Sequence, residues 1–277
     1  MASRLPLPHC ARSLCSRCSV SSDWDLSGRP SASLRFITMK YFNLRLYLVT
    51  DENCLPPGRN LYEAVEEALQ AGVTLVQYRE KNGLGKGMLE KARKLVVLCH
   101  KYNVPLLVND RLDIALLSGA DGVHLGQDDI PVAEARRMAN LFFANCAATH
   151  TANSTHQQTG SRFIIGATAH NVEEALAAEA AGADYLGCGA VFATSTKKDT
   201  IPLGLEGLKA IRKTVHIPIA GIAGITPDNY RQVLEAGADG AAVVSAILGA
   251  ASVKGTVNRF LVVDPCNPKN EQHNSQY

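Results

Sequence analysis

The chain has 277 residues, of which 46% are hydrophobic and 19% are charged, and its formal net charge is +2. This apolar content is enough to build a large core, so it excludes a wholly disordered chain. The near-balance of charge and an aromatic content of only 6% disfavour a nucleic-acid-binding surface. No uncharged stretch is both long and apolar enough to cross a membrane, so we expect no membrane partner.

Residues 1–38 differ in composition from the rest of the chain. They contain five Arg, nine Ser and no Lys, and two Asp are their only acidic residues. This composition is typical of a mitochondrial transit peptide. An over-long gene model with Met39 as the natural start explains it equally well. We predict a disordered or transit-like extension, in a protein that is cytoplasmic, or mitochondrial if the extension is a transit peptide.

From residue 44 onward, short β-rich runs alternate with helical runs. The β-rich runs are apolar almost throughout, which indicates burial on both faces, as in a parallel sheet. We predict eight strands, at 44–50, 73–78, 105–109, 121–125, 162–167, 184–188, 217–221 and 239–244.

Several predicted helices begin with recognisable capping residues. Asn60 and Asn171 are each followed by a Glu at the third helical position, which is the capping-box pattern. Thr226 is followed by Pro227, a residue that favours the first position of a helix. We therefore expect helices to start after Asn60, Asn171 and Thr226.

A glycine-containing joint recurs between helix and strand, at 71–73, 119–121, 182–184 and 237–239. Glycine readily adopts the left-handed conformation that ends a helix. The interval between the second and third joints is the longest, and the polar run 139–161 lies within it. We predict an inserted loop at 139–161.

Eight strands that each precede a helix predict a closed (β/α)8 TIM barrel, one domain over residues 39–255, with a polar C-terminal tail at 256–277. A doubly wound open sheet is the alternative, and it would usually place a Gly-rich loop after the first strand. The first predicted strand instead leads into Thr50-Asp51-Glu52-Asn53, which contains no glycine. We therefore favour the barrel.

Functional residues of such a barrel lie where the strands end at their carboxyl side. Three cations, Arg79, Lys81 and Lys197, and two carboxylates, Asp110 and Asp129, follow predicted strands. Carboxylates beside cations suit a magnesium ion that bridges to phosphate oxygens, and the whole set suits a diphosphate. For any single residue, a salt bridge at a loop end is the alternative.

The last two predicted strands indicate a second anion site. Gly221 and Gly224 follow one strand and Val244-Ser245 follows the other, each at the start of a short helix. Glycine lets the backbone approach a phosphate, and the N–H groups at a helix start bind it. His124 is open to two interpretations, a ligand or base beside the acidic loop, or a hydrogen-bonded core histidine.

Six strings occur in order along residues 44–250, and together they resemble the thiamine-phosphate synthase (thiamine-phosphate pyrophosphorylase) family. The strings are Leu46-Tyr-Leu-Val-Thr-Asp51, Gln77-Tyr-Arg-Glu-Lys81, Val108-Asn-Asp110, Asp121-Gly-Val-His-Leu-Gly-Gln-Asp-Asp129, Thr194-Ser-Thr-Lys-Lys-Asp-Thr200 and Gly221-Ile-Ala-Gly-Ile225.

The resemblance implies an enzyme of thiamine biosynthesis that uses two substrates. It would join 4-amino-5-hydroxymethyl-2-methylpyrimidine diphosphate to a thiazole phosphate and release diphosphate, through a dissociative, carbocation-like step. Carried over by position, Asp110 and Asp129 would bind Mg²⁺, and Arg79, Lys81 and Lys197 would act catalytically. The implied pyrimidine diphosphate ligands are Gln77, Arg79, Lys81, Asn109, Thr168 and Lys197, and the implied thiazole phosphate ligands are Thr194, Thr196, Gly224, Val244 and Ser245.

Three further residues within the same runs, Tyr78, Glu80 and Ser195, are also expected to contact substrate. Two positions depart from the family pattern, since Thr168 stands where Ser is frequent and Ala223 replaces a common glycine. Alternatives from other classes are a thiazole tautomerase on the same barrel and a non-catalytic barrel that binds thiamine precursors. The resemblance suggests a homo-oligomer, and the polar tail is too short for the C-terminal kinase that some members carry.

Overall fold

In the computed structural model, which describes residues 42–148, 162–194 and 202–263, eight parallel strands form a closed barrel. Each strand pairs with the next along the chain, and the eighth closes the ring by pairing with the first. This confirms the predicted (β/α)8 TIM barrel. The strands are β1 (Leu46–Val49), β2 (Leu75–Tyr78), β3 (Leu106–Asn109), β4 (Gly122–Leu125), β5 (Ile164–Ala169), β6 (Tyr185–Cys188), β7 (Ile219–Ile222) and β8 (Gly240–Val243).

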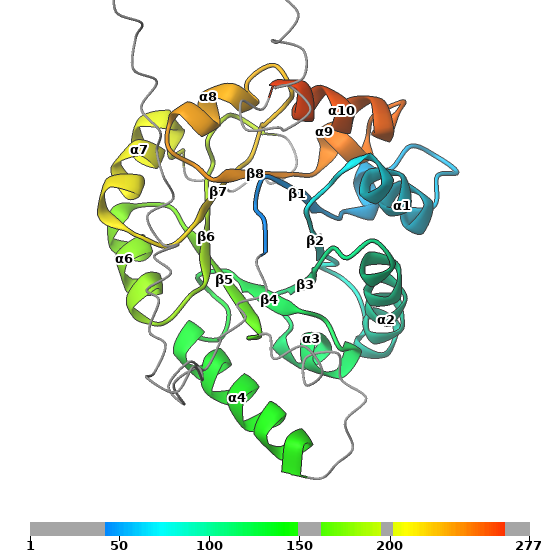
Figure 1. The fold of residues 1–277 in the computed structure, drawn as a ribbon, viewed down its shortest axis with the longest axis vertical. Coiled ribbons are helices and arrows are strands. Elements are labelled where there is room, and N and C mark those ends of the chain that lie inside the picture. The colour runs from blue at the N-terminus through cyan, green and yellow to red at the C-terminus, as the bar shows by residue number, and fades with distance from the viewer. Residues whose placement is uncertain (1–41, 149–161, 195–201, 264–277) are drawn as a thin grey trace, which may run out of the picture. The chain divides into compact units, whose positions relative to one another are not determined.

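The helices form an outer ring around the strands (Figure 1). Each predicted strand matches an observed one, so the alternation of runs along the chain located the barrel correctly. The helices are η1 (Glu52–Cys54), α1 (Leu61–Ala71), α2 (Gly85–Lys101), α3 (Leu112–Ser118), α4 (Val132–Ala148), α6 (Val172–Ala180), α7 (Gly204–Thr214), α8 (Tyr230–Glu235), α9 (Ser245–Leu248) and α10 (Val253–Val263).

The strands carry two hydrophobic cores because successive side chains point to opposite faces. One core fills the barrel and contains Tyr47, Leu107 and Tyr185. The other, larger core lies between strands and helices, and neighbouring strand residues such as Leu48 and Leu186 belong to it. Burial on both faces explains why the strands read as continuous apolar runs.

Two of the three predicted helix starts are confirmed. The Asn60 side chain caps α1 by accepting from the Tyr62 N–H at 2.8 Å. Asn171 caps α6 by accepting from the Glu174 N–H at 2.8 Å, and the Glu174 carboxylate accepts from the Asn171 side chain in return. The same carboxylate also accepts from the His170 N–H at 2.8 Å, so this helix start is tied on both sides.

The third predicted helix start is wrong. Residues from Thr226 form turns, and α8 begins only at Tyr230. Asn229 accounts for the turn, because its side-chain oxygen accepts from the Thr226 N–H at 2.8 Å and its side-chain nitrogen donates to the Gly224 carbonyl at 2.9 Å. Asn229 thus anchors the loop that follows β7.

Two predicted boundaries also move. We expected a loop from residue 139, but α4 continues through Ala148, because Ala139 is buried and the Phe143 ring packs on Phe163 with centroids 5.8 Å apart. We expected the barrel to end at 255, but α10 extends it to Val263 and buries Val257 and Phe260. The predictions for residues 1–38, 149–161 and 264–277 lie outside the described residues.

A side chain just before each even-numbered strand accepts a hydrogen bond from a backbone N–H at the start of the preceding odd-numbered strand. Leu46, at the start of β1, donates its N–H to the Thr74 hydroxyl at 3.1 Å. Three aspartates do the same for later strands with N···O distances of 2.7–2.9 Å, at Asp121 to Leu106, Asp184 to Ile165 and Asp239 to Ile219. The recurrent joint in the sequence therefore marks a fourfold structural repeat at the amino ends of the strands.

Each of these aspartates also pairs with a cationic or ionisable residue on a helix. His100 on α2 lies 2.8 Å from Asp121, Arg136 on α4 lies 2.5 Å from Asp184, and Arg212 on α7 lies 3.3 Å from Asp239. These contacts lie at the end of the barrel opposite the predicted site, a face that serves stability in this fold. Among the described residues, no helix is long and apolar enough to cross a membrane.

Candidate functional site at the carboxyl ends of the strands

The run Gln77–Lys81 alternates between two faces as it leaves β2. The Gln77 amide reaches into the barrel and donates to Tyr47. Tyr78 belongs to the core under the helices, and its hydroxyl donates to Glu80. Glu80 in turn lies 3.1 Å from the Lys91 ammonium on α2. Tyr78 and Glu80 therefore face the helix layer, whereas Gln77 faces the barrel.

Arg79 is held by residues that follow β1. Its guanidinium donates to the Asp51 carboxylate at 2.6 Å, and its backbone N–H donates to the Thr50 hydroxyl at 2.9 Å. The Asp51 side chain is only 10% exposed, so this pair is largely shielded from water. Sequence reasoning missed the role of Asp51, although it lies in the first matching string. The signal was its position at the end of a strand.

The two predicted metal ligands lie together at the ends of β3 and β4. Burial is the largest cause that raises the pKa of the Asp129 carboxyl, and the neighbouring Asp110 carboxylate, which favours a proton on Asp129, raises it further. The Lys81 ammonium lies 2.6 Å from the Asp110 carboxylate, and the Gly126 N–H donates to Asp129 at 2.6 Å. Two carboxylates are thus crowded next to one cation.

This arrangement fits a magnesium ion. A divalent cation between Asp110 and Asp129 would relieve the repulsion that raises the pKa of Asp129. The described residues contain no cluster of three or more His, Cys, Asp and Glu side chains that could enclose a metal. Magnesium commonly binds one or two carboxylates and completes its shell with water and substrate phosphate. Asp110 and Asp129 could therefore supply two carboxylate ligands to such an ion.

Asp110 also has an unusual backbone. Its φ angle is +64°, in the left-handed region that few side chains other than Asn and Asp adopt. Its N–H donates to the His124 carbonyl at 2.8 Å, which ties the end of β3 to β4. The strained conformation sets the position from which the carboxylate meets Lys81 and Asp129.

A continuous line of hydrogen bonds crosses the interior of the barrel. Gln77 donates to the Tyr47 hydroxyl, and Tyr47 lies 2.8 Å from the Tyr185 hydroxyl. Tyr185 lies 2.8 Å from His124 Nδ1, and His124 Nε2 lies 3.0 Å from the Thr168 hydroxyl. The line thus joins two predicted substrate ligands, Gln77 and Thr168, through three residues that no sequence pattern had connected.

The two interpretations of His124 are resolved toward a hydrogen-bonded interior residue. Burial lowers the pKa of His124 to about 4, partly offset by the charge of Asp110, so the ring is neutral near pH 7. Both ring nitrogens contact hydroxyl groups, and His124 belongs to no metal-binding cluster among the described residues. His124 is therefore a neutral interior residue whose two ring nitrogens both lie within hydrogen-bonding distance of hydroxyl groups.

The loop after β7 packs directly on the loop after β6. A Cβ atom at Gly224 would lie 2.4 Å from the Ala193 carbonyl oxygen, and Gly224 has a φ of +64°, so no other residue fits there. The Phe192 N–H donates to the Ala223 carbonyl at 3.2 Å. This contact brings Thr194 and Gly224, two predicted thiazole phosphate ligands, onto neighbouring loops.

The remaining predicted ligands lie around this loop pair or beyond the described residues. Val244 packs against the core that fills the barrel, and Ser245 begins the short helix α9 with an exposed side chain. Asn109 ends β3 opposite His124 in the register of β4. Ser195, Thr196 and Lys197 lie outside the described residues.

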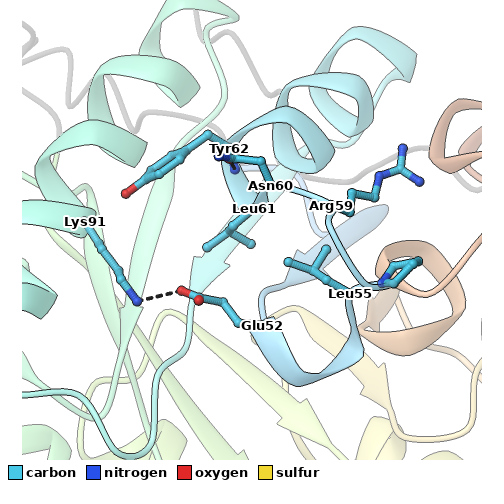
Figure 2. Close-up of a pocket in the computed structure, with 8 residues that line it drawn as sticks. Glu52, Leu55, Arg59, Asn60, Leu61, Tyr62 and Lys91 are labelled. Atoms are coloured by element: carbon cyan, nitrogen blue, oxygen red, sulfur yellow. Dashed lines mark hydrogen bonds and ion pairs between the residues drawn. The ribbon is translucent and has the colours of Figure 1, made fainter.

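A separate hollow of about 360 Å³ lies between η1, α1 and α2 (Figure 2). Glu52, Arg59, Tyr62 and Lys91 are among the residues that line it, and Figure 2 shows Lys91 reaching Glu52, at 2.7 Å. None of the predicted site residues lines it. The hollow lies next to the loop that follows β2, because Lys91, which lines the hollow, also contacts Glu80 of that loop.

Comparison with known proteins places these residues in a family context. The family model described as "Thiamine monophosphate synthase" matches residues 46–144 and 145–247. The thiamine-phosphate synthase of Clostridium acetobutylicum is 45% identical over 216 residues, which cover 78% of this chain and 92% of that protein. The enzyme of the same name from Chloroflexus aurantiacus is 48% identical over 210 residues, covering 76% of this chain and 87% of that protein.

A solved structure agrees with the sequence relatives. The thiamine phosphate pyrophosphorylase of Pyrococcus furiosus superposes with a TM-score of 0.67 at 39% identity. The match covers 79% of this chain and 95% of the Pyrococcus furiosus chain. Fold and sequence therefore point to the same group of proteins.

Proposed function

The chain belongs to the thiamine-phosphate synthase family, and from this membership we propose how its barrel rim performs the thiamine-phosphate synthase step of thiamine biosynthesis. A pyrimidinylmethyl group passes from its diphosphate to the nitrogen of a thiazole phosphate. The C–O bond to the diphosphate breaks, and the diphosphate leaves with the bonding electrons. The thiazole nitrogen then supplies the electron pair of the new C–N bond, which yields thiamine phosphate and diphosphate.

Cations at the rim stabilise the leaving diphosphate. Arg79 is aimed by the buried carboxylate of Asp51, and Lys81 extends from the same loop to the acidic pair. The family resemblance implies Lys197, which lies outside the described residues, as a third cation for this role. Charge that develops on the leaving oxygens is stabilised best by groups that are already oriented, because little reorganisation is then needed.

Asp110 and Asp129 would hold the magnesium ion, together with oxygens of the diphosphate. When bound, Mg²⁺ neutralises part of the negative charge of the diphosphate and so makes it a better leaving group. The Lys81 ammonium lies 2.6 Å from the Asp110 carboxylate. The positive charge of Lys81 would therefore offset negative charge both on the Asp110 carboxylate and on the diphosphate.

The pyrimidine would be held by Gln77, Asn109 and Thr168 at the mouth of the barrel. These residues position the reacting carbon without acting as nucleophile or base, and positioning alone lowers a barrier substantially. The thiazole phosphate would bind at the adjoining loops, to Thr194, Gly224, Val244 and Ser245, with Ser195 and Thr196. Tyr78 and Glu80 instead brace the β2 loop against Lys91, and we propose this supporting role in place of substrate contact.

The grouping of Lys81, Asp110 and Asp129 on three adjacent strand ends carries this proposal. Its test is incubation of the purified chain with both substrates and Mg²⁺, followed by assay of both products. Diphosphate and thiamine phosphate should appear together in equal amounts. An isomerised thiazole as the sole product would support the tautomerase alternative. The absence of any product would support the non-catalytic barrel that binds thiamine precursors.

A further inference from the structure

The interior line of hydrogen bonds has a direction that its end groups impose. At one end, the Gln77 amide nitrogen can only donate, so the Tyr47 oxygen accepts from it. Tyr47 has one proton of its own, and Tyr185 is the remaining neighbour that can accept it, at 2.8 Å. A buried hydroxyl left without an acceptor would lose the free energy of its lost hydration.

The donor and acceptor roles of Tyr185, His124 and Thr168 follow in the same way. The Tyr185 oxygen accepts from Tyr47, so the Tyr185 proton goes to His124 Nδ1, 2.8 Å away. A neutral imidazole with Nδ1 accepting carries its proton on Nε2, which donates to the Thr168 hydroxyl at 3.0 Å. The Thr168 oxygen is then occupied as an acceptor, and its own O–H is left to donate.

We propose that Tyr185 is a positioning residue for the pyrimidine diphosphate: its hydroxyl relays this one-directional line, so that the Thr168 O–H does not donate to His124 and is presented as a donor to the substrate. The inference rests on the proposed role of Thr168 in binding that substrate. The Tyr185 hydroxyl has Tyr47 and His124 as its two partners on this line. Its effect on binding is therefore indirect, through the tautomer of His124.

The barrel interior is shaped to keep the Tyr185 ring in place. A Cβ atom at Gly166 would lie 2.2 Å from the Tyr185 ring, and one at Gly187 would lie 2.9 Å from the His124 ring. Both glycines thus provide the space that these two side chains occupy. The Tyr47 ring packs edge-on against Tyr185 with centroids 5.9 Å apart. Glycine within a strand often marks such a close approach.

The first experiment compares two tyrosine-to-phenylalanine variants. Tyr185→Phe removes the relaying hydroxyl and keeps the ring. Tyr230→Phe removes another buried hydroxyl, one that donates to the Arg45 carbonyl outside the site, and serves as the matched control. We measure the dissociation constant of pyrimidine diphosphate by calorimetry with Mg²⁺ and without thiazole phosphate. It should rise about tenfold in Tyr185→Phe and stay within twofold in Tyr230→Phe.

A double-mutant cycle then tests whether Tyr185 acts through Thr168. Thr168→Val removes the donor, so adding Tyr185→Phe to it should weaken binding no further. In Thr168→Ser, which keeps a hydroxyl, adding Tyr185→Phe should again weaken binding about tenfold. Full additivity of Tyr185→Phe with Thr168→Val would overturn the proposal, as would an unchanged dissociation constant in Tyr185→Phe alone.

A spectroscopic readout separates relaying from a general structural effect. Nitrogen chemical shifts of His124 in the free enzyme should report the tautomer protonated on Nε2, and Tyr185→Phe should lose this uniform state while Tyr230→Phe keeps it. The Nδ1-protonated tautomer in the unmutated chain would overturn the proposal. If this chain binds pyrimidine diphosphate but makes no thiamine phosphate, the proposed function fails while the cycle still decides the relay.

Discussion

The Lys81 ammonium lies 2.6 Å from the Asp110 carboxylate, so a cation and an acid from the neighbouring ends of β2 and β3 form an ion pair. The charge of Asp110 also reaches Asp129, whose pKa it helps to raise. Lys81, Asp110 and Asp129 form one interacting group of a single cation and two acids, so a change in any of them alters the other two. We therefore expect losses at this group to appear in catalysis far more than in stability.

Replacing Asp110 by Asn should cost at least a hundredfold in kcat/KM and weaken Mg²⁺ binding measured by calorimetry. Asn is the suitable replacement, because it tolerates the φ of +64° that would strain most residues. The melting temperature should change by only a few degrees. Asp113→Asn is the control, since Asp113 forms an exposed pair with Arg111 and should retain activity. Full turnover of Asp110→Asn at saturating Mg²⁺ would disprove the metal assignment.

Replacing Asp51 by Asn should lower kcat/KM about tenfold, because Arg79 loses the partner that aims it. Part of this loss should appear as a higher KM for pyrimidine diphosphate, whereas the KM for thiazole phosphate should not change. Glu67→Gln is the matched control, since Glu67 pairs with Arg59 at 2.7 Å and neither is a predicted site residue. Equal effects of the two variants on kcat/KM would argue against a role for Asp51 in the site.

Replacing Ala223 by Gly should stabilise the protein by about 0.5–1 kcal/mol, measured by urea unfolding. Ala223 has a φ of +81°, where a Cβ atom is strained and glycine is not. This is the position where the sequence departs from the family's glycine, so the departure costs stability. Ala220→Gly, within strand β7, should destabilise instead. A loss of stability in Ala223→Gly would contradict the strain argument.

Replacing Asp184 by Ala should cost about 2–4 kcal/mol of stability. The Ile165 N–H would lose its acceptor, and Arg136, whose side chain is only 14% exposed, would lose its partner. The folded variant should keep its kcat/KM, because this contact lies at the amino ends of the strands. Asp228→Ala should cost almost nothing, since the Asp228–Arg259 pair is exposed. A loss of kcat/KM in folded Asp184→Ala would show that the two ends of the barrel are coupled.

Acid should destabilise the protein through His124. Its pKa is about 4 in the folded state, below the ordinary value near 6.5, so the unfolded chain binds the proton more readily. The contribution of His124 is therefore complete above about pH 6.5 and is lost as pH falls toward 4. Between pH 7.5 and 5 we expect a loss on the order of 2 kcal/mol from this residue.

The measurement for His124 is urea unfolding of the unmutated chain and of His124→Gln at both pH values. The variant should lose less stability over this interval, by about the same 2 kcal/mol. Tyr230→Phe is the control, because it removes a buried hydroxyl that donates to the Arg45 carbonyl and leaves His124 unchanged. Identical pH dependence in the unmutated chain and His124→Gln would rule out a buried neutral His124.

The sequence by itself determined the barrel and most of the rim. Eight apolar runs separated by helical runs leave few other packings, and the carboxyl ends of parallel strands must lie at one face. Arg79, Lys81, Asp110 and Asp129 could therefore be placed on one rim from their positions after strands. Local pattern was less reliable at element ends, where Asn229 rather than Thr226 set the start of α8.

Only the tertiary structure decided what each rim residue contacts. Gln77 and Thr168 are 91 positions apart, and their link runs through Tyr47, Tyr185 and His124, from three other strands. Barrel closure brings these strands face to face, and no local periodicity records which interior side chains then meet. The same holds for Asp51 and Arg79: their charges are visible in the sequence, but their pairing depends on the register between β1 and β2.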